Sequence, residues 1–177
     1  EDIDELAERI GGEEVEGFGK SLEDFDQTAM NTFATFQFMI GNEDWRVPFM
    51  RNIKFVQQDG NDKLTPIPYD FDASGLVYAK YAKPDRDLKL QSVRQRAFMG
   101  DFKNKEDRAE MVALFNAKKD SIYGLIENFK VMNKVEKAKT IAYFDTFYEI
   151  INTPKLLKAA MPLRGRAAIP TDINGAL

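Results

Sequence analysis

The stretch RNIKFVQQDGNDKLTPIPYDFD, residues 51–72, departs from the helical patterning of the rest of the chain. Ile53 and Phe55 alternate with their neighbours as in a β-strand, and residues 59–62 are turn formers. Residues 64–69 then run back as a second strand, which makes a β-hairpin. Two prolines in this second strand cannot donate to a ladder, so we expect it to be short or at an edge.

Helices are predicted before the hairpin by hydrophobic residues at three- to four-residue spacing. The first covers residues 1–10 and is stopped by a pair of glycines. A second helix, of about 20 residues, is predicted to begin at the N-cap Ser21. It is expected to end at Gly41, because glycine readily adopts the left-handed C-cap conformation.

Helices also dominate the chain after the hairpin. We expect a loop over residues 73–87 and then a short helix over residues 92–99. Two long helices are predicted to begin at the N-caps Asn104 and Asn133, and a last short helix follows Pro154.

The predicted fold class is therefore mostly α with one β-hairpin, an α+β arrangement. We expect a single helical domain over residues 1–161, with the hairpin at about residues 52–70, and a C-terminal tail over residues 162–177. A length of 177 residues and a hydrophobic content of 44% suit one globular domain.

Composition narrows the possible chemistry. With no Cys and no His, thiolate nucleophiles, disulfides, imidazole bases and zinc sites of the usual kinds are excluded within this chain. Any catalysis must rest on carboxylates, amides, Lys, Arg or Tyr, with a hard cation such as Mg²⁺ as the expected metal.

The net charge of −4 argues against a nucleic-acid partner. Basic residues do gather over residues 80–96 and 134–139, but acids are interleaved nearby, and we interpret both clusters as solvated faces. No run approaches the roughly 18 apolar residues of a membrane span. The acidic start lacks an initiator Met, so we expect residues upstream, and the compartment is left open.

Four polar residues flank the hairpin: Asp44 and Asn52 before it, Asp70 and Asp72 after it. A hairpin brings its two ends together, so these side chains should gather. Their oxygens could hold Mg²⁺, which takes one or two carboxylates and completes its shell with water and phosphate oxygens. Capping of turns and helix ends is the alternative role of Asp and Asn, and solvated turns are the alternative for the later pair.

This arrangement resembles the catalytic half of the protein-kinase-like fold, in which an Asp and an Asn precede a short hairpin and a metal-binding Asp follows it. The similarity is nearest to an uncharacterised set of bacterial proteins that resemble the atypical CotH-type and HipA-type kinases. The residues that carry it are Ile40-Gly41-Asn42-Glu43-Asp44-Trp45, Arg51-Asn52-Ile53-Lys54-Phe55 and Pro66-Ile67-Pro68-Tyr69-Asp70-Phe71-Asp72.

The resemblance implies the helical C-terminal lobe of a kinase-like fold that uses Mg²⁺ and ATP to phosphorylate an unknown hydroxyl acceptor. It makes Asp44 the carboxylate that orients or deprotonates that hydroxyl. Asn52 and Asp70 become metal and nucleotide ligands, and Asp72 a second metal ligand or a hydrogen-bond partner. The glycine-rich, ATP-holding N-terminal lobe has no counterpart here, so we expect it to be missing from this chain.

The sequence departs from the kinase pattern in its spacing. Asp44 and Asn52 are eight positions apart, against about five in the kinase catalytic loop. Either the loop that contains Pro48 bulges, or Asn42 and Glu43 replace one of the pair.

Two other functional classes stay open. A degenerate kinase-like module would keep the fold and bind a partner without turnover. A hydrolase would use Asp44 with Asp70 or Asp72 as a carboxylate pair, with neither an upstream lobe nor a metal.

Overall fold

The computed structural model describes residues 2–164 and contains one antiparallel sheet. Its strands are β1 (Gly12–Glu14), β2 (Ile53–Gln58) and β3 (Leu64–Pro68), in the order β1-β2-β3. The predicted hairpin is confirmed, with Ile53 paired to Pro68 at its open end. The proline-containing strand lies at an edge, as its missing donors require.

The third strand, β1, was not predicted. It adds to the other side of β2, where Glu13 pairs with Gln57, and the Val15 N–H donates to the Phe55 carbonyl at 2.9 Å. Its backbone runs so close to β2 that a Cβ on Gly12 would collide with the Gln57 carbonyl. A strand of three residues carries no readable alternation, so sequence patterning could not reveal it.

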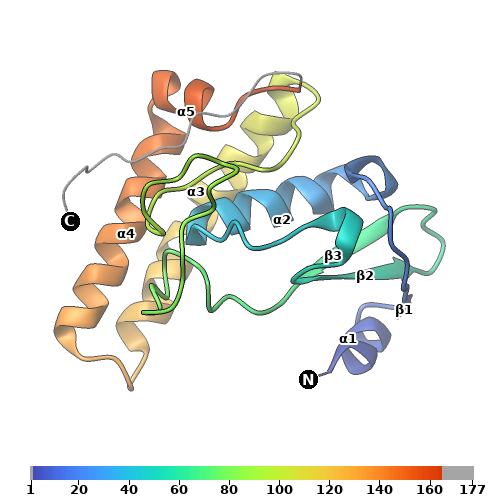
Figure 1. Cartoon of the computed structure of the whole chain (residues 1–177), viewed down its shortest axis with the longest axis horizontal. Coiled ribbons are helices and arrows are strands. Elements are labelled where there is room, and N and C mark those ends of the chain that lie inside the picture. Colours follow the sequence, from blue (N-terminus) through green and yellow to red (C-terminus); the bar gives the residue numbers. More distant parts are fainter. Residues whose placement is uncertain (1, 165–177) are drawn as a thin grey trace.

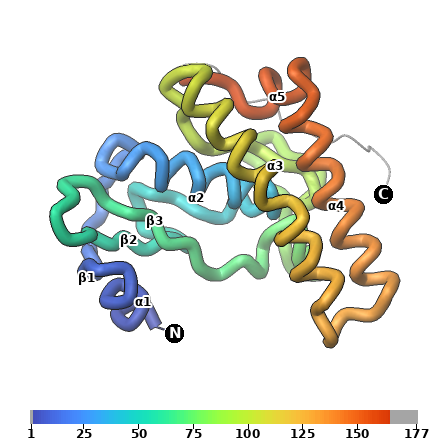
Figure 2. Tube along the Cα trace, turned by 180° about the vertical axis from the view of Figure 1, so that it is seen from behind, coloured from blue at the N-terminus to red at the C-terminus, as the bar shows by residue number. Residues whose placement is uncertain are grey.

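Helices lie on both sides of this sheet (Figure 1). Their bounds are α1 (Ile3–Arg9), α2 (Gln27–Ile40), α3 (Lys105–Asn128), α4 (Lys134–Asn152) and α5 (Pro154–Ala160), with short 3₁₀ turns η1 (Leu22–Asp24) and η2 (Val47–Phe49). Helices α2 to α5 lie to one side of this sheet, and α1 lies on its other side. The α+β class is therefore established. From behind, α2 runs between the sheet at one end and the α3–α4 pair at the other (Figure 2).

The predicted start of the second helix is wrong. Ser21 caps only the single turn η1, after which the chain becomes extended at Phe25. The reason is tertiary: the Asp26 N–H donates to the Leu64 carbonyl at 2.9 Å, and the Phe25 ring packs edge-on against Phe55. Helix α2 begins after its N-cap Asp26 and has 14 residues.

The short helix predicted over residues 92–99 is also wrong, because that segment consists of turns and extended chain. Arg96 lies at its centre with 2% of its surface exposed. Its guanidinium donates to the carbonyls of Met39 and Tyr143 and to the Thr146 hydroxyl. These bonds hold the segment between α2 and α4 in a conformation that local propensity does not specify.

The other helices predicted after the hairpin are present. Asn104 and Asn133 cap α3 and α4 as expected, and α5 begins at Pro154. The first residues of the predicted tail dock on the domain, since Leu163 pairs with Phe102; residues 165–177 lie outside the described part. Among the helices of residues 2–164, none is long and apolar enough to cross a membrane.

Candidate functional site

The first candidate residues lie in the loop that directly follows the C-terminal end of α2. Gly41 caps the helix in the left-handed conformation, with φ of 63°, as its sequence position predicted. The next residue, Asn42, is buried and bonded within the loop: its amide donates to Gln37 Oε1 at 3.0 Å and its oxygen accepts from the Asp44 N–H at 3.1 Å. Asn42 thus shapes the loop and presents Asp44.

The eight-residue spacing between Asp44 and Asn52 is accommodated by a bulge. Arg46 and Arg51 exchange two backbone hydrogen bonds, of 3.0 and 3.1 Å, which close a small loop around the 3₁₀ turn η2. Asn52 is thereby returned to Asp44, and its Nδ2 donates to the Asp44 carbonyl at 2.6 Å and to Oδ2 at 3.1 Å. Of the two explanations the sequence left open, the structure shows the bulge.

Asp72 reaches the same region through the backbone that follows it. The Gly75 N–H donates to the Gly41 carbonyl at 2.7 Å, and the Leu76 N–H donates to the Ile40 carbonyl at 2.9 Å. These two bonds fasten the segment after the hairpin to the C-terminal end of α2. The hairpin and the helix end together therefore bring Asp72 to the region of Asp44.

The gathered residues surround a hollow of about 380 Å³. Its wall contains Glu43, Asp44, Arg51, Asp72, Ala73, Tyr81, Ala82, Lys83, Pro84, Asp85 and Val93. Asp44 and Asp72 are thus on one wall, as the sequence predicted. Asn52 lies behind Asp44, and Asp70 is exposed beside the rim rather than on the wall.

The Asp44 carboxylate is paired on both oxygens. Arg51 contacts Oδ1 at 2.5 Å and Asn52 contacts Oδ2 at 3.1 Å. The Arg51 side chain is 60% exposed and that of Asp44 29% exposed. An exposed pair of this kind contributes about 0–1 kcal/mol, so an incoming ligand can displace the guanidinium at little cost.

Glu43 is the buried carboxyl of the site, with 7% of its surface exposed. Burial raises its pKa to about 8, against the opposing effects of the Ala97 N–H bond and the Arg96 charge. The Ala97 N–H donates to Glu43 Oε1 at 3.0 Å. At neutral pH this carboxyl is therefore mostly protonated, and it can donate as well as accept a hydrogen bond.

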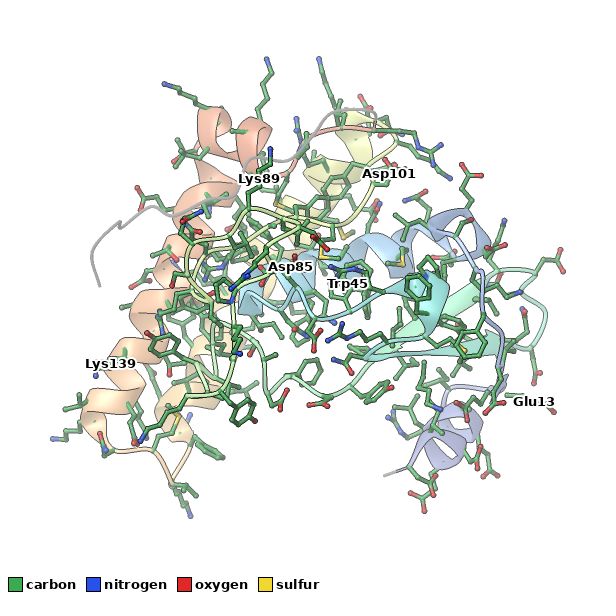
Figure 3. The ribbon with its side chains drawn as sticks, in the orientation of Figure 1. Glu13, Trp45, Asp85, Lys89, Asp101 and Lys139 are labelled. Atoms are coloured by element: carbon green, nitrogen blue, oxygen red, sulfur yellow. The ribbon has the colours of Figure 1, made fainter. Side chains whose placement is uncertain are left out.

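The loop of residues 73–91 lines the hollow and is fastened there by two side-chain contacts, in addition to the backbone bonds of Gly75 and Leu76. The Tyr81 hydroxyl donates to Asp72 at 2.7 Å, and Asp85, labelled in Figure 3, pairs with Arg46 at 2.6 Å. Its hydrogen bond to Asp72 raises the pKa of the Tyr81 phenol, and the charge of Asp70 acts in the same direction. Sequence reasoning missed Tyr81 and Asp85, because the loop that delivers them has no periodic pattern.

Asn52 and Asp70 share an uncommon backbone conformation. Their φ values are 52° and 53°, in the left-handed region that few non-glycine residues adopt, although Asn and Asp enter it most easily. They are adjacent across the open end of the hairpin, where the Tyr69 N–H donates to the Asn52 carbonyl at 3.4 Å. Backbone strain of this kind concentrates at functional sites.

The donor set bears on the expected cation. Within residues 2–164, no three carboxylates converge as a complete metal cage. Mg²⁺ does not require one, since it uses one or two carboxylates and takes its other oxygens from water and phosphate. Of the predicted ligands, Asp72 is on the wall of the hollow, the Asn52 amide is bonded to Asp44, and Asp70 is exposed outside the lining.

Trp45, the sole tryptophan, belongs to the core and does not line the hollow. It is 3% exposed and packs edge-on against Phe33, with ring centroids 4.9 Å apart.

Neither a known family model nor a curated protein or solved structure gives a significant match to this chain.

Proposed function

We propose that this chain is the C-terminal, metal-binding half of an atypical kinase-like phosphotransferase that uses Mg²⁺-ATP. The observation that carries the proposal is the presence of Asp44 and Asp72 at one 380 Å³ hollow, with Asn52 hydrogen-bonded to Asp44 despite their long spacing. In this proposal Asp44 orients the acceptor hydroxyl and takes its proton. Asn52 and Asp70 hold the cation, with Asp72 as a further ligand or hydrogen-bond partner.

A bound Mg²⁺ would supply charge neutralisation at the transferring phosphoryl group. The residues of this chain would supply position. The Asn52 amide fixes Asp44, and the Tyr81 hydroxyl fixes Asp72. The glycines ahead of the hairpin, at positions 11, 12, 17 and 19, lie in β1 and short connecting segments and not in a nucleotide-binding lobe, so this proposal takes the ATP-holding lobe from outside residues 2–164.

A second function, a kinase-like binding module without turnover, is favoured by the Arg51–Asp44 ion pair. A carboxylate whose two oxygens are both engaged is poorly placed to accept a proton. The two proposals differ in whether a ligand displaces Arg51.

Calorimetric titration with Mg²⁺-ATP tests the first proposal, using both this chain and the longest natural chain that contains it. We expect binding by the longer chain and loss of at least about tenfold in affinity in Asp70→Ala. Asp62→Ala, at the far turn of the hairpin, is the matched control. Phosphoryl transfer by the longer chain, lost in Asp44→Asn, separates the kinase from the binding module.

Absence of Mg²⁺-ATP binding by either chain would overturn the kinase proposal. Hydrolytic activity that persists in excess chelator would instead favour the carboxylate-pair hydrolase, which requires no metal.

A further inference from the structure

A second hollow, here called the α4 groove, lies between the loop of residues 73–91 and the first half of α4. Its volume of about 580 Å³ is in the range of small-molecule sites. Ala138 and Ala142 form its floor, because small residues on successive helical turns leave space above them. Val135 and Tyr78 give it apolar sides, and both are more than half exposed.

Three cations stand on the edge of the α4 groove: Arg94, Lys134 and Lys139. Lys139, labelled in Figure 3, projects from α4. Across residues 2–164 none of the three has a carboxylate within ion-pair distance. Because the whole chain carries a net charge of −4, this is a local excess of positive charge.

Arg94 is held in place rather than free in solvent. Its guanidinium carbon lies 4.3 Å from the centroid of the Tyr143 ring and 5.5 Å from that of Tyr78. Aromatic faces attract a cation without neutralising it. The fold also joins members of the two basic clusters, residues 80–96 and 134–139, which are far apart in the sequence.

We propose that the α4 groove binds an amphipathic organic anion: one molecule with a hydrocarbon or aromatic body and a carboxylate or phosphate head. The apolar floor and sides remove the body from water, and the three uncompensated cations meet the head. A cationic amphiphile would match only the apolar part, and a purely polar anion would match only the cationic edge. This inference is independent of the proposed kinase function, since it concerns a different hollow and is read as binding.

The probe is decanoate, titrated as a monomer below its critical micelle concentration and followed by calorimetry and backbone-amide NMR. We expect saturable binding with shifts in the first half of α4 and around residue 78, and none with decyltrimethylammonium. The double substitution Lys134→Gln with Lys139→Gln should weaken binding by about tenfold or more. Lys155→Gln with Lys158→Gln on α5 removes two exposed lysines elsewhere and should change nothing.

A second variant tests the apolar floor. Ala138→Leu with Ala142→Leu fills the α4 groove, so decanoate binding should weaken about tenfold. Leucine is a good helix former and both positions are exposed, so the variant should still fold. Ala113→Leu with Ala117→Leu, two exposed alanines of α3, is the control. Circular dichroism confirms folding of each variant.

Three outcomes would overturn the proposal. One is equal binding of the cationic amphiphile, and another is decanoate binding that neither variant pair weakens. The third is no binding of monomeric decanoate at millimolar concentration, whether or not the protein sediments with anionic phospholipid vesicles. If the protein sediments with vesicles but does not bind monomeric decanoate, the basic residues of the α4 groove would be assigned to binding of a membrane surface instead.

Discussion

At the scale of single residues, Glu43 has a direct thermodynamic consequence. Its pKa of about 8 in the folded chain compares with an ordinary value of 4.5. Between those pH values the folded chain holds a proton that the unfolded chain has released, so its contribution to stability is lost as the pH rises through 8.

We therefore predict that Glu43→Gln flattens the pH dependence of stability. The amide can still accept from the Ala97 N–H but does not ionise. Between pH 6 and pH 8 the free energy of unfolding of the wild type should fall by about 2 kcal/mol more than that of the variant. Urea unfolding at both pH values measures this, and parallel profiles for the two proteins would contradict it.

Residue-level reasoning recovered part of the site from sequence. Asn52 and Asp70 could be placed together because a hairpin joins its own ends, which is a local rule. Glu43 gave no such signal, since its burial depends on contacts with Ala97 and Arg96, more than fifty positions away. The same reason hides Asp85, which reaches the site through its ion pair with Arg46.

At the scale of elements, α2, α4 and the loop of residues 73–91 meet at Gly41. A Cβ there would collide with the Tyr143 hydroxyl, in addition to the cost of its positive φ. We predict that Gly41→Ala lowers the free energy of unfolding by about 3 kcal/mol, measured in urea.

Gly19→Ala separates strain from collision. Gly19 has a φ of 80°, but a Cβ there would meet nothing within 4 Å. It should cost about 1 kcal/mol, the conformational part alone. Equal losses at the two positions would show that Tyr143 moves aside freely.

The loop over the 380 Å³ hollow gives a second prediction at this scale. Asp85 accepts from the N–H groups of Asp87 and Leu88 and pairs with Arg46, so it anchors one half of the loop. Asp85→Ala should speed amide hydrogen exchange by about tenfold at Leu88 and its neighbours, with no change in β2. Asp87→Ala, exposed in the same loop, is the control; unchanged exchange in Asp85→Ala would show that the loop is held elsewhere.

Elements with local signals were predictable and those set by tertiary contacts were not. The caps Asn104 and Asn133 and the C-cap Gly41 depend on bonds within a few residues of the chain. The segment around Arg96 reads as helical, but its turns are held by carbonyls of α2 and α4. Strand β1 exists only because β2 offers it an edge.

At the scale of the whole molecule, Arg164 ties together three distant parts of the chain. It pairs with Asp101 at 2.5 Å and Glu23 at 2.9 Å, and its backbone N–H donates to the Phe102 carbonyl. Both ion pairs are at least partly exposed to solvent, so salt should weaken them. We predict that Arg164→Gln lowers the Tm at low ionic strength and that the difference shrinks in 0.5 M NaCl. Lys158→Gln, an exposed lysine outside the described ion pairs, should show no such salt-dependent difference, and a deficit in Arg164→Gln that persists in salt would assign the effect to packing.

The loop of residues 73–91 is one wall of both hollows: Tyr81 and Asp85 face the carboxylate site, and Tyr78 faces the α4 groove. Any energetic coupling between ligands in the two hollows would be reciprocal. If an amphiphile that settles Tyr78 changes the affinity for Mg²⁺-nucleotide by some factor, the nucleotide must change the affinity for the amphiphile by that same factor. Through this shared loop, occupancy of one hollow would then be reported at the other.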